Sequence, residues 1–185
     1  MNWNEYTSCF EEILHGKVTN APYDDPHFLE YTKLNHSRMI RWLKQGKINE
    51  QLIEEIKKIS NPQDWVLITE PWCGDAAHIV PFINMLSEMN PLIKLDLQLR
   101  DSPGSEIDQY LTNGGKSVPK LIIRNVDHID LLVWGPRPQA AQQVFMDAKA
   151  QGLEIEQQKM ALQQWYNTDK GVSLQEELLQ FFNSN

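Results

Sequence analysis

Residues 65–76 read WVLITEPWCGDA, and this stretch decides how the rest of the chain is interpreted. Its first five residues are an apolar run of strand length between Pro62 and Pro71, which is typical of a buried strand. Cys73 follows, and from Ala76 to Asn90 the apolar residues return at helical spacing. A thiol at a helix N-terminus faces unsatisfied N–H groups and the positive end of the helix dipole, and both favour the thiolate. Cys73 is therefore the candidate reactive group.

The pattern on either side predicts an α/β core with helical extensions. Three amphipathic helices are expected before the strand: one from Trp3 to Leu14, one ending near Gly46 and one running from about Asn49 to Ile59. After the helix that follows Cys73, we expect a strand at 92–99, a helix at 106–111 and strands at 118–123 and 131–134. The chain is then predicted to be helical through about residue 166. A last helix is expected to begin at Ser173, where Ser173 and Glu176 have capping-box spacing.

The segment Trp72-Cys73-Gly74-Asp75-Ala76 resembles the thioredoxin motif Trp-Cys-Gly-Pro-Cys. Two further markers of that family are present in the right order. A proline lies eight residues after the cysteine, at Pro81, and Val118-Pro119 resembles the cis-proline that opens the strand facing the active site. The resemblance covers about residues 64–149.

This resemblance implies a thioredoxin fold, with a central mixed sheet of four or five strands flanked by helices. The expected division is an N-terminal helical extension at 1–60, a thioredoxin-like core at 61–150 and a C-terminal helical extension at 151–185. All three parts are expected to form one compact domain.

The chain also departs from the thioredoxin pattern. Ala76 occupies the position of the resolving cysteine, so the motif cannot close an internal disulfide. Leu67 stands where thioredoxins bury an aspartate that accepts a proton during the exchange. Asp75 and Glu70 add negative charge near the thiol and oppose its ionisation, while the helix end favours it. We expect the helix end to dominate and to hold the pKa of Cys73 below its ordinary value.

The resemblance also implies a substrate groove beside Cys73. Trp72, Gly74, Asp75, Val118 and Pro119 are its expected lining, and the backbone of Val118 would pair with a bound chain. Residues 134–138 read WGPRP and have two interpretations. They mark the junction of a strand with a helix, or Trp134 and Arg137 border the groove, with Arg137 offering a cation to an acidic ligand.

Two other side chains are candidates for a part in the chemistry. Cys9 lies between aromatic residues on the first helix, which favours a small buried apolar residue over a distant resolving thiol. His78 lies off the helical face of Cys73, which favours an ordinary helix residue over a catalytic base. The other histidines are scattered without metal-ligand spacing, so we expect no metal site and no cofactor.

The bulk composition limits the classes of partner. With 185 residues and a net charge of −8, the chain lacks the surplus of Lys and Arg that nucleic acid or an anionic membrane surface would require. No stretch approaches the roughly 20 apolar residues that span a bilayer, and the N-terminus does not resemble a secretory signal. Two cysteines in total favour reduced thiols and a cytoplasmic location. The composition leaves the oligomeric state open.

Two functions fit these observations. The first is monothiol thiol–disulfide exchange, in which Cys73 attacks a protein or low-molecular-weight disulfide and an external thiol resolves the mixed disulfide. The second is a catalytically inactive binding module that holds a peptide or partner protein in the groove by Trp72 and Pro119.

Overall fold

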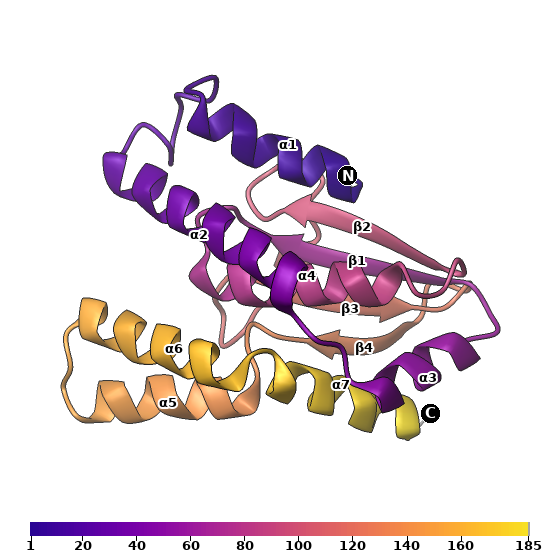
Figure 1. The fold of residues 1–185 in the computed structure, drawn as a ribbon. Helices are drawn as coiled ribbons and strands as arrows, with labels where there is room; N and C mark the ends of the chain where they lie inside the picture. Colours follow the sequence, from indigo (N-terminus) through magenta and orange to yellow (C-terminus); the bar gives the residue numbers. More distant parts are fainter. Residues whose placement is uncertain (185) are drawn as a thin grey trace.

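A four-stranded mixed sheet forms the centre of the computed structural model, which describes residues 1–184 (Figure 1). Its strands are β1 (Gln63–Thr69), β2 (Ile93–Leu99), β3 (Lys120–Arg124) and β4 (Asp130–Trp134), in the spatial order β2-β1-β3-β4. β1 pairs parallel with β2 and antiparallel with β3, which pairs antiparallel with β4. This arrangement confirms the predicted α/β class and the mixed sheet.

Within residues 1–184, seven α-helices surround the sheet. They are α1 (Trp3–Leu14), α2 (Pro26–Gln45), α3 (Glu50–Lys58), α4 (Gly74–Ser87), α5 (Gln139–Ala150), α6 (Ile155–Asp169) and α7 (Val172–Asn183). In Figure 1, α2 and α4 cross in front of the sheet, and α1 lies on the β2 side. None of the helices in the described part of the chain has the length and apolarity needed to cross a membrane.

The central position of β1 follows from its composition. Trp65, Leu67 and Ile68 have no exposed surface, because β1 has a strand on each side and helices over its faces. A strand that is buried in this way needs apolar side chains in its buried part, and residues Trp65 to Ile68 provide them. β1 therefore delivers its C-terminal end, and Cys73 just beyond it, to a fixed place at the edge of the core.

Polar contacts fix the two ends of the chain on this core. The Met1 ammonium group donates to Asp96 Oδ1 at 2.6 Å and to the Leu97 carbonyl oxygen at 2.8 Å, which holds α1 against β2. At the other end, the indole nitrogen of Trp134 donates to Glu177 Oε2 at 2.6 Å and links β4 to α7. The helical segments outside the sheet are thus tied to both of its edges.

The predicted continuous helix from the end of β4 to residue 166 is wrong. The chain leaves α5 at Gln151 and turns through Gly152, whose φ is +72°, before α6 begins at Ile155. A left-handed glycine ends a helix readily because it has no Cβ to clash. The result is a hairpin of two packed helices that projects beyond the sheet (Figure 1).

Two smaller expectations also differ from the structure. The helix expected at 106–111 is only a 3₁₀ turn at Ile107–Gln109. The last helix begins at Val172 with Gly171 as its N-cap, so Ser173 does not cap it. Asp169 takes that role, since its carboxylate accepts from the backbone N–H groups of Gly171 and Ser173 at 3.1 Å each.

One buried amide joins α7 to the loop between α2 and α3. The side chain of Gln175 is 3% exposed, donates to the carbonyl oxygens of Lys47 and Gly171, and accepts from the N–H of Asn49 at 2.6 Å. We predict that Gln175→Ala lowers the free energy of unfolding by about 1–3 kcal/mol, because the three hydrogen bonds of this buried amide are lost. Urea denaturation measures this.

Gln164→Ala serves as the control, because Gln164 also lies on a helix but is exposed. This variant should change stability by less than about 0.5 kcal/mol. Equal effects of the two substitutions would show that the buried amide does not hold α7 in place.

Candidate functional site

Cys73 is the N-cap residue of α4 and follows β1 after the short turn Glu70-Pro71-Trp72. Its backbone N–H donates to the Glu70 carbonyl oxygen at 3.0 Å, and its Sγ donates to the Val118 carbonyl oxygen at 3.3 Å. The Val118–Pro119 peptide bond is cis, as expected from the sequence. The thiol and the proline loop therefore face each other as the thioredoxin pattern implies.

The thiol of Cys73 is held in its protonated form. It is 8% exposed, and burial raises its pKa to about 12, with the Asp75 carboxylate as the next contributor. The backbone N–H groups of Ala76 and Asp75 and the guanidinium of Arg137 lower the pKa, but burial outweighs them. The expectation of a pKa below the ordinary value is wrong, because the helix terminus lies inside the protein and not at its surface.

The carboxylate of Asp75 is enclosed and fully engaged. Its side chain is 10% exposed, and Oδ2 accepts from Arg137 Nη2 at 2.6 Å and from Arg137 Nε at 3.1 Å. Oδ1 accepts from the Tyr166 hydroxyl at 2.7 Å. Burial and the nearby Asp75 charge raise the pKa of Tyr166, which keeps this hydroxyl a donor. The start of α4 is thereby bound to the loop before α5 and to α6.

Glu70 lines a hollow that does not include Cys73. This hollow also contains Cys9 and Tyr23, and Glu70 Oε1 accepts from the Asp101 N–H at 3.2 Å. Burial raises the pKa of Glu70 to about 7. Cys9 is half-buried and unpaired, more exposed than the sequence suggested, and lines this hollow, whereas Cys73 does not.

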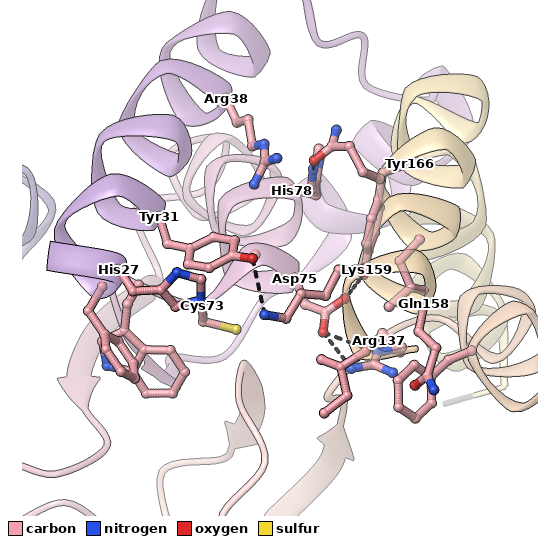
Figure 2. A pocket seen from close by; sticks show the side chains of 17 residues that line it. His27, Tyr31, Arg38, Cys73, Asp75, His78, Arg137, Gln158, Lys159 and Tyr166 are labelled. Atoms are coloured by element: carbon pink, nitrogen blue, oxygen red, sulfur yellow. Dashed lines mark hydrogen bonds and ion pairs between the residues drawn. The ribbon is translucent and has the colours of Figure 1, made fainter. Parts of the chain in front are cut away.

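Two hollows flank Cys73, one on each side. The first is a groove of about 500 Å³ that includes Trp72, Val118 and Lys116. The second is a pocket of about 480 Å³ between α2 and α6, which Figure 2 shows from close by. Trp72, Cys73, Asp75 and Arg137 line both, so they form the wall between them.

Most of the residues expected in the groove lie there. Trp72, Asp75, Val118 and Arg137 line it, while Gly74 lines the pocket between α2 and α6. Pro119 is buried and lines neither hollow, so the groove reaches the residue before the cis-proline and not the proline itself. Arg137 is not a free cation, because Asp75 already pairs with it. Trp134 lies outside both hollows, since its ring is buried in β4 and bonded to Glu177.

The pocket contains side chains that no sequence motif singles out, above all Arg38 and Tyr166. They lie far from Cys73 in the sequence, on helices whose apolar spacing predicts only a core-facing stripe. His78, interpreted as an ordinary helix residue, accepts from the Trp42 indole N–H at 2.9 Å and stacks on Tyr166 with ring centres 4.3 Å apart. Burial lowers the pKa of His78 to about 3, so it is neutral.

Comparisons with known proteins agree with this geometry. A model of the thioredoxin family matches residues 23–151. Among solved structures, the chain is similar to a protein of unknown function from Pseudomonas aeruginosa, with a TM-score of 0.51 and 16% identity over 76% of this chain and 85% of that one.

The chain is also similar to an HIV epitope-scaffold, with a TM-score of 0.55 and 13% identity over 100% of this chain and 99% of that one. At such identities, the two structures show a shared fold alone. No curated protein matches the chain at a significant level.

The raised pKa of Glu70 predicts a pH-dependent stability. The pKa of Glu70 is about 7 in the folded protein, whereas its ordinary value is 4.5. The tighter binding of the proton therefore stabilises the fold fully below pH 4.5, and this stabilisation is lost as the pH rises through 7. Glu70→Gln, which keeps the acceptor for Asp101, should leave stability unchanged at pH 4 and raise it by on the order of 2–3 kcal/mol at pH 8.

Denaturant unfolding of both proteins at pH 4, 6 and 8 measures this difference. Glu88→Gln is the control, because Glu88 is exposed at the end of α4. A Glu70→Gln protein that is no more stable than the parent at pH 8 would contradict a buried, raised-pKa carboxyl.

Proposed function

The chain belongs to the thioredoxin family, and on that premise we propose that it is a binding protein of this fold. In this proposal it holds an extended peptide or a segment of a partner protein in the groove beside Trp72 and Pro119. Cys73 contributes to the floor of the groove as a neutral thiol and does not act as a nucleophile.

The state of Cys73 is the observation that carries this proposal. Thiol–disulfide exchange needs the thiolate, and its rate follows the thiolate fraction. A buried thiol whose pKa is raised to about 12, and whose proton is donated to the Val118 carbonyl oxygen, supplies almost no thiolate at neutral pH. Ala76 supplies no second thiol to release a mixed disulfide.

The groove itself supports the binding of an extended chain. Thioredoxins pair the backbone next to the cis-proline with their substrate, and the corresponding N–H here, that of Val118, finds no acceptor within residues 1–184. Trp72 offers an apolar wall on the other side of the thiol. An extended peptide would add main-chain hydrogen bonds at Val118 and apolar contacts at Trp72.

Monothiol exchange is the second candidate, and one observation favours it. The N–H groups of Asp75 and Ala76 point toward the sulfur and, with Arg137, act to lower the thiol pKa. In that reaction the Cys73 thiolate attacks one sulfur of a disulfide, the S–S bond breaks, and the other sulfur leaves as a thiolate. An external thiolate then attacks the mixed disulfide, and Cys73 leaves as a thiolate and takes up a proton.

The pH dependence of Cys73 alkylation separates the two candidates. In a Cys9→Ser background we predict that the iodoacetamide rate still rises above pH 9, because the thiol is buried beside Asp75. Asp75→Asn should shift the curve to lower pH, since it removes the charge that raises the pKa. The Cys9→Ser/Cys73→Ser protein, which has no thiol, gives the background rate.

A parent curve that reaches its plateau at or below pH 8.5 would overturn the binding proposal in favour of monothiol exchange. A curve that Asp75→Asn leaves in place would show that this carboxylate does not act on the sulfur.

A further inference from the structure

The pocket between α2 and α6 differs in chemistry from the groove on the other side of Cys73. Its walls are largely aromatic and aliphatic, with Phe28 and Tyr31 from α2, Trp72 from the loop before α4, Phe145 from α5 and Leu162 from α6. A volume of about 480 Å³ lies in the range of pockets that enclose small organic molecules. The walls therefore suit a small ligand with an apolar, flat part.

One cation in this pocket has no counter-charge. Figure 2 shows the guanidinium of Arg38 extending from α2 into the space between the helices. It comes close to Gly74 at the start of α4, since Nη1 lies 4.0 Å from the position that a Cβ atom at residue 74 would occupy. Nη1 donates to Asn35 Oδ1 at 2.8 Å, but no carboxylate within residues 1–184 pairs with Arg38. Burial and the nearby Arg41 charge lower the pKa of Arg38, which marks a cation that has lost solvent without gaining an anion.

The other cations of the pocket are already neutralised. Arg137 pairs with Asp75, and Lys159 pairs with Glu156 Oε1 at 2.8 Å. Lys159 also donates to the Tyr31 hydroxyl at 3.0 Å, a contact that bridges α6 and α2 beside the pocket (Figure 2). The pocket therefore lacks one negative charge, which a singly charged ligand would supply.

We propose that this pocket binds a small aromatic monocarboxylate, with the carboxylate on the Arg38 guanidinium and the ring among the aromatic walls. The planar guanidinium matches the two oxygens of a carboxylate, and a partly desolvated pair of this kind is stronger than one in water. A doubly charged phosphate would need a second unpaired cation in the lining, and the other cations that line the pocket, Arg137 and Lys159, already have carboxylate partners. The inference concerns the pocket alone, so it stands or falls separately from the function proposed for the groove.

Three probes that share a naphthyl group and differ in charge test this assignment. Isothermal titration calorimetry of the full chain with 2-naphthylacetate should show binding at least tenfold tighter than with 2-naphthylacetamide, which keeps the ring and loses the charge. The ammonium analogue 2-(2-naphthyl)ethylamine should not bind, because its charge repels Arg38.

Variants on α2 locate the charge. Arg38→Gln should weaken the binding of 2-naphthylacetate at least tenfold. Arg38→Lys should weaken it less, because it keeps the positive charge and loses only the planar pair of N–H donors. Lys33→Gln removes the same charge from an exposed site on the same helix and should change the dissociation constant by less than twofold. Circular dichroism confirms that each variant is folded.

Several results would overturn the proposal. They are the absence of binding up to 5 mM, equal binding of the carboxylate and the amide, and an unchanged affinity in folded Arg38→Gln. Displacement of 2-naphthylacetate by an equal concentration of inorganic phosphate would also overturn it, since that marks an anion site without recognition of the ring. If Arg38→Gln does not fold, the probe series on the parent and the comparison of Arg38→Lys with Lys33→Gln still decide the matter.

Discussion

The enclosed carboxylate of Asp75 is the constraint on which the site depends. It joins three parts of the chain, because Arg137 lies before α5, Tyr166 lies on α6 and Asp75 lies in the first turn of α4. Removing one partner of a buried ion pair costs about 3–5 kcal/mol, because the other charge is left buried and unpaired. Asp75 and Arg137 are therefore held together. This one carboxylate thus links the α5–α6 hairpin to α4 at the wall of the pocket.

Burial of Cys73, with this carboxylate beside it, keeps the thiol protonated. A cysteine at a helix N-terminus is usually acidic because N–H groups and the helix dipole stabilise its charge. Here α6 and the loop before α5 cover that terminus, which removes the water that would stabilise a thiolate and places a negative charge beside it. Burial of the sulfur is the larger effect, so the feature that makes thioredoxin cysteines reactive is present here but outweighed.

The sequence predicts those parts of the structure that depend on local pattern. The apolar run of β1, the helix after Cys73 and the cis bond at Val118–Pro119 each depend on neighbouring residues, and all three are present. The α5–α6 turn was missed because one glycine in a polar helical stretch is a weak signal. The pairing of Asp75 with Arg137 and the entry of Arg38 into the pocket were missed because they join distant residues, whose proximity only tertiary packing creates.

Pairing also explains why the charged residues around Cys73 have different roles. A cation that already has a buried carboxylate, such as Arg137, gains little from a second anion and serves to fix the wall between the groove and the pocket. A cation that has lost water without gaining an anion, as Arg38 has, gains the most from one. The chain carries a net charge of −8, so general attraction would not concentrate anions at this protein. An anion that binds here must therefore be recognised at short range, by the guanidinium of Arg38 and the aromatic walls around it.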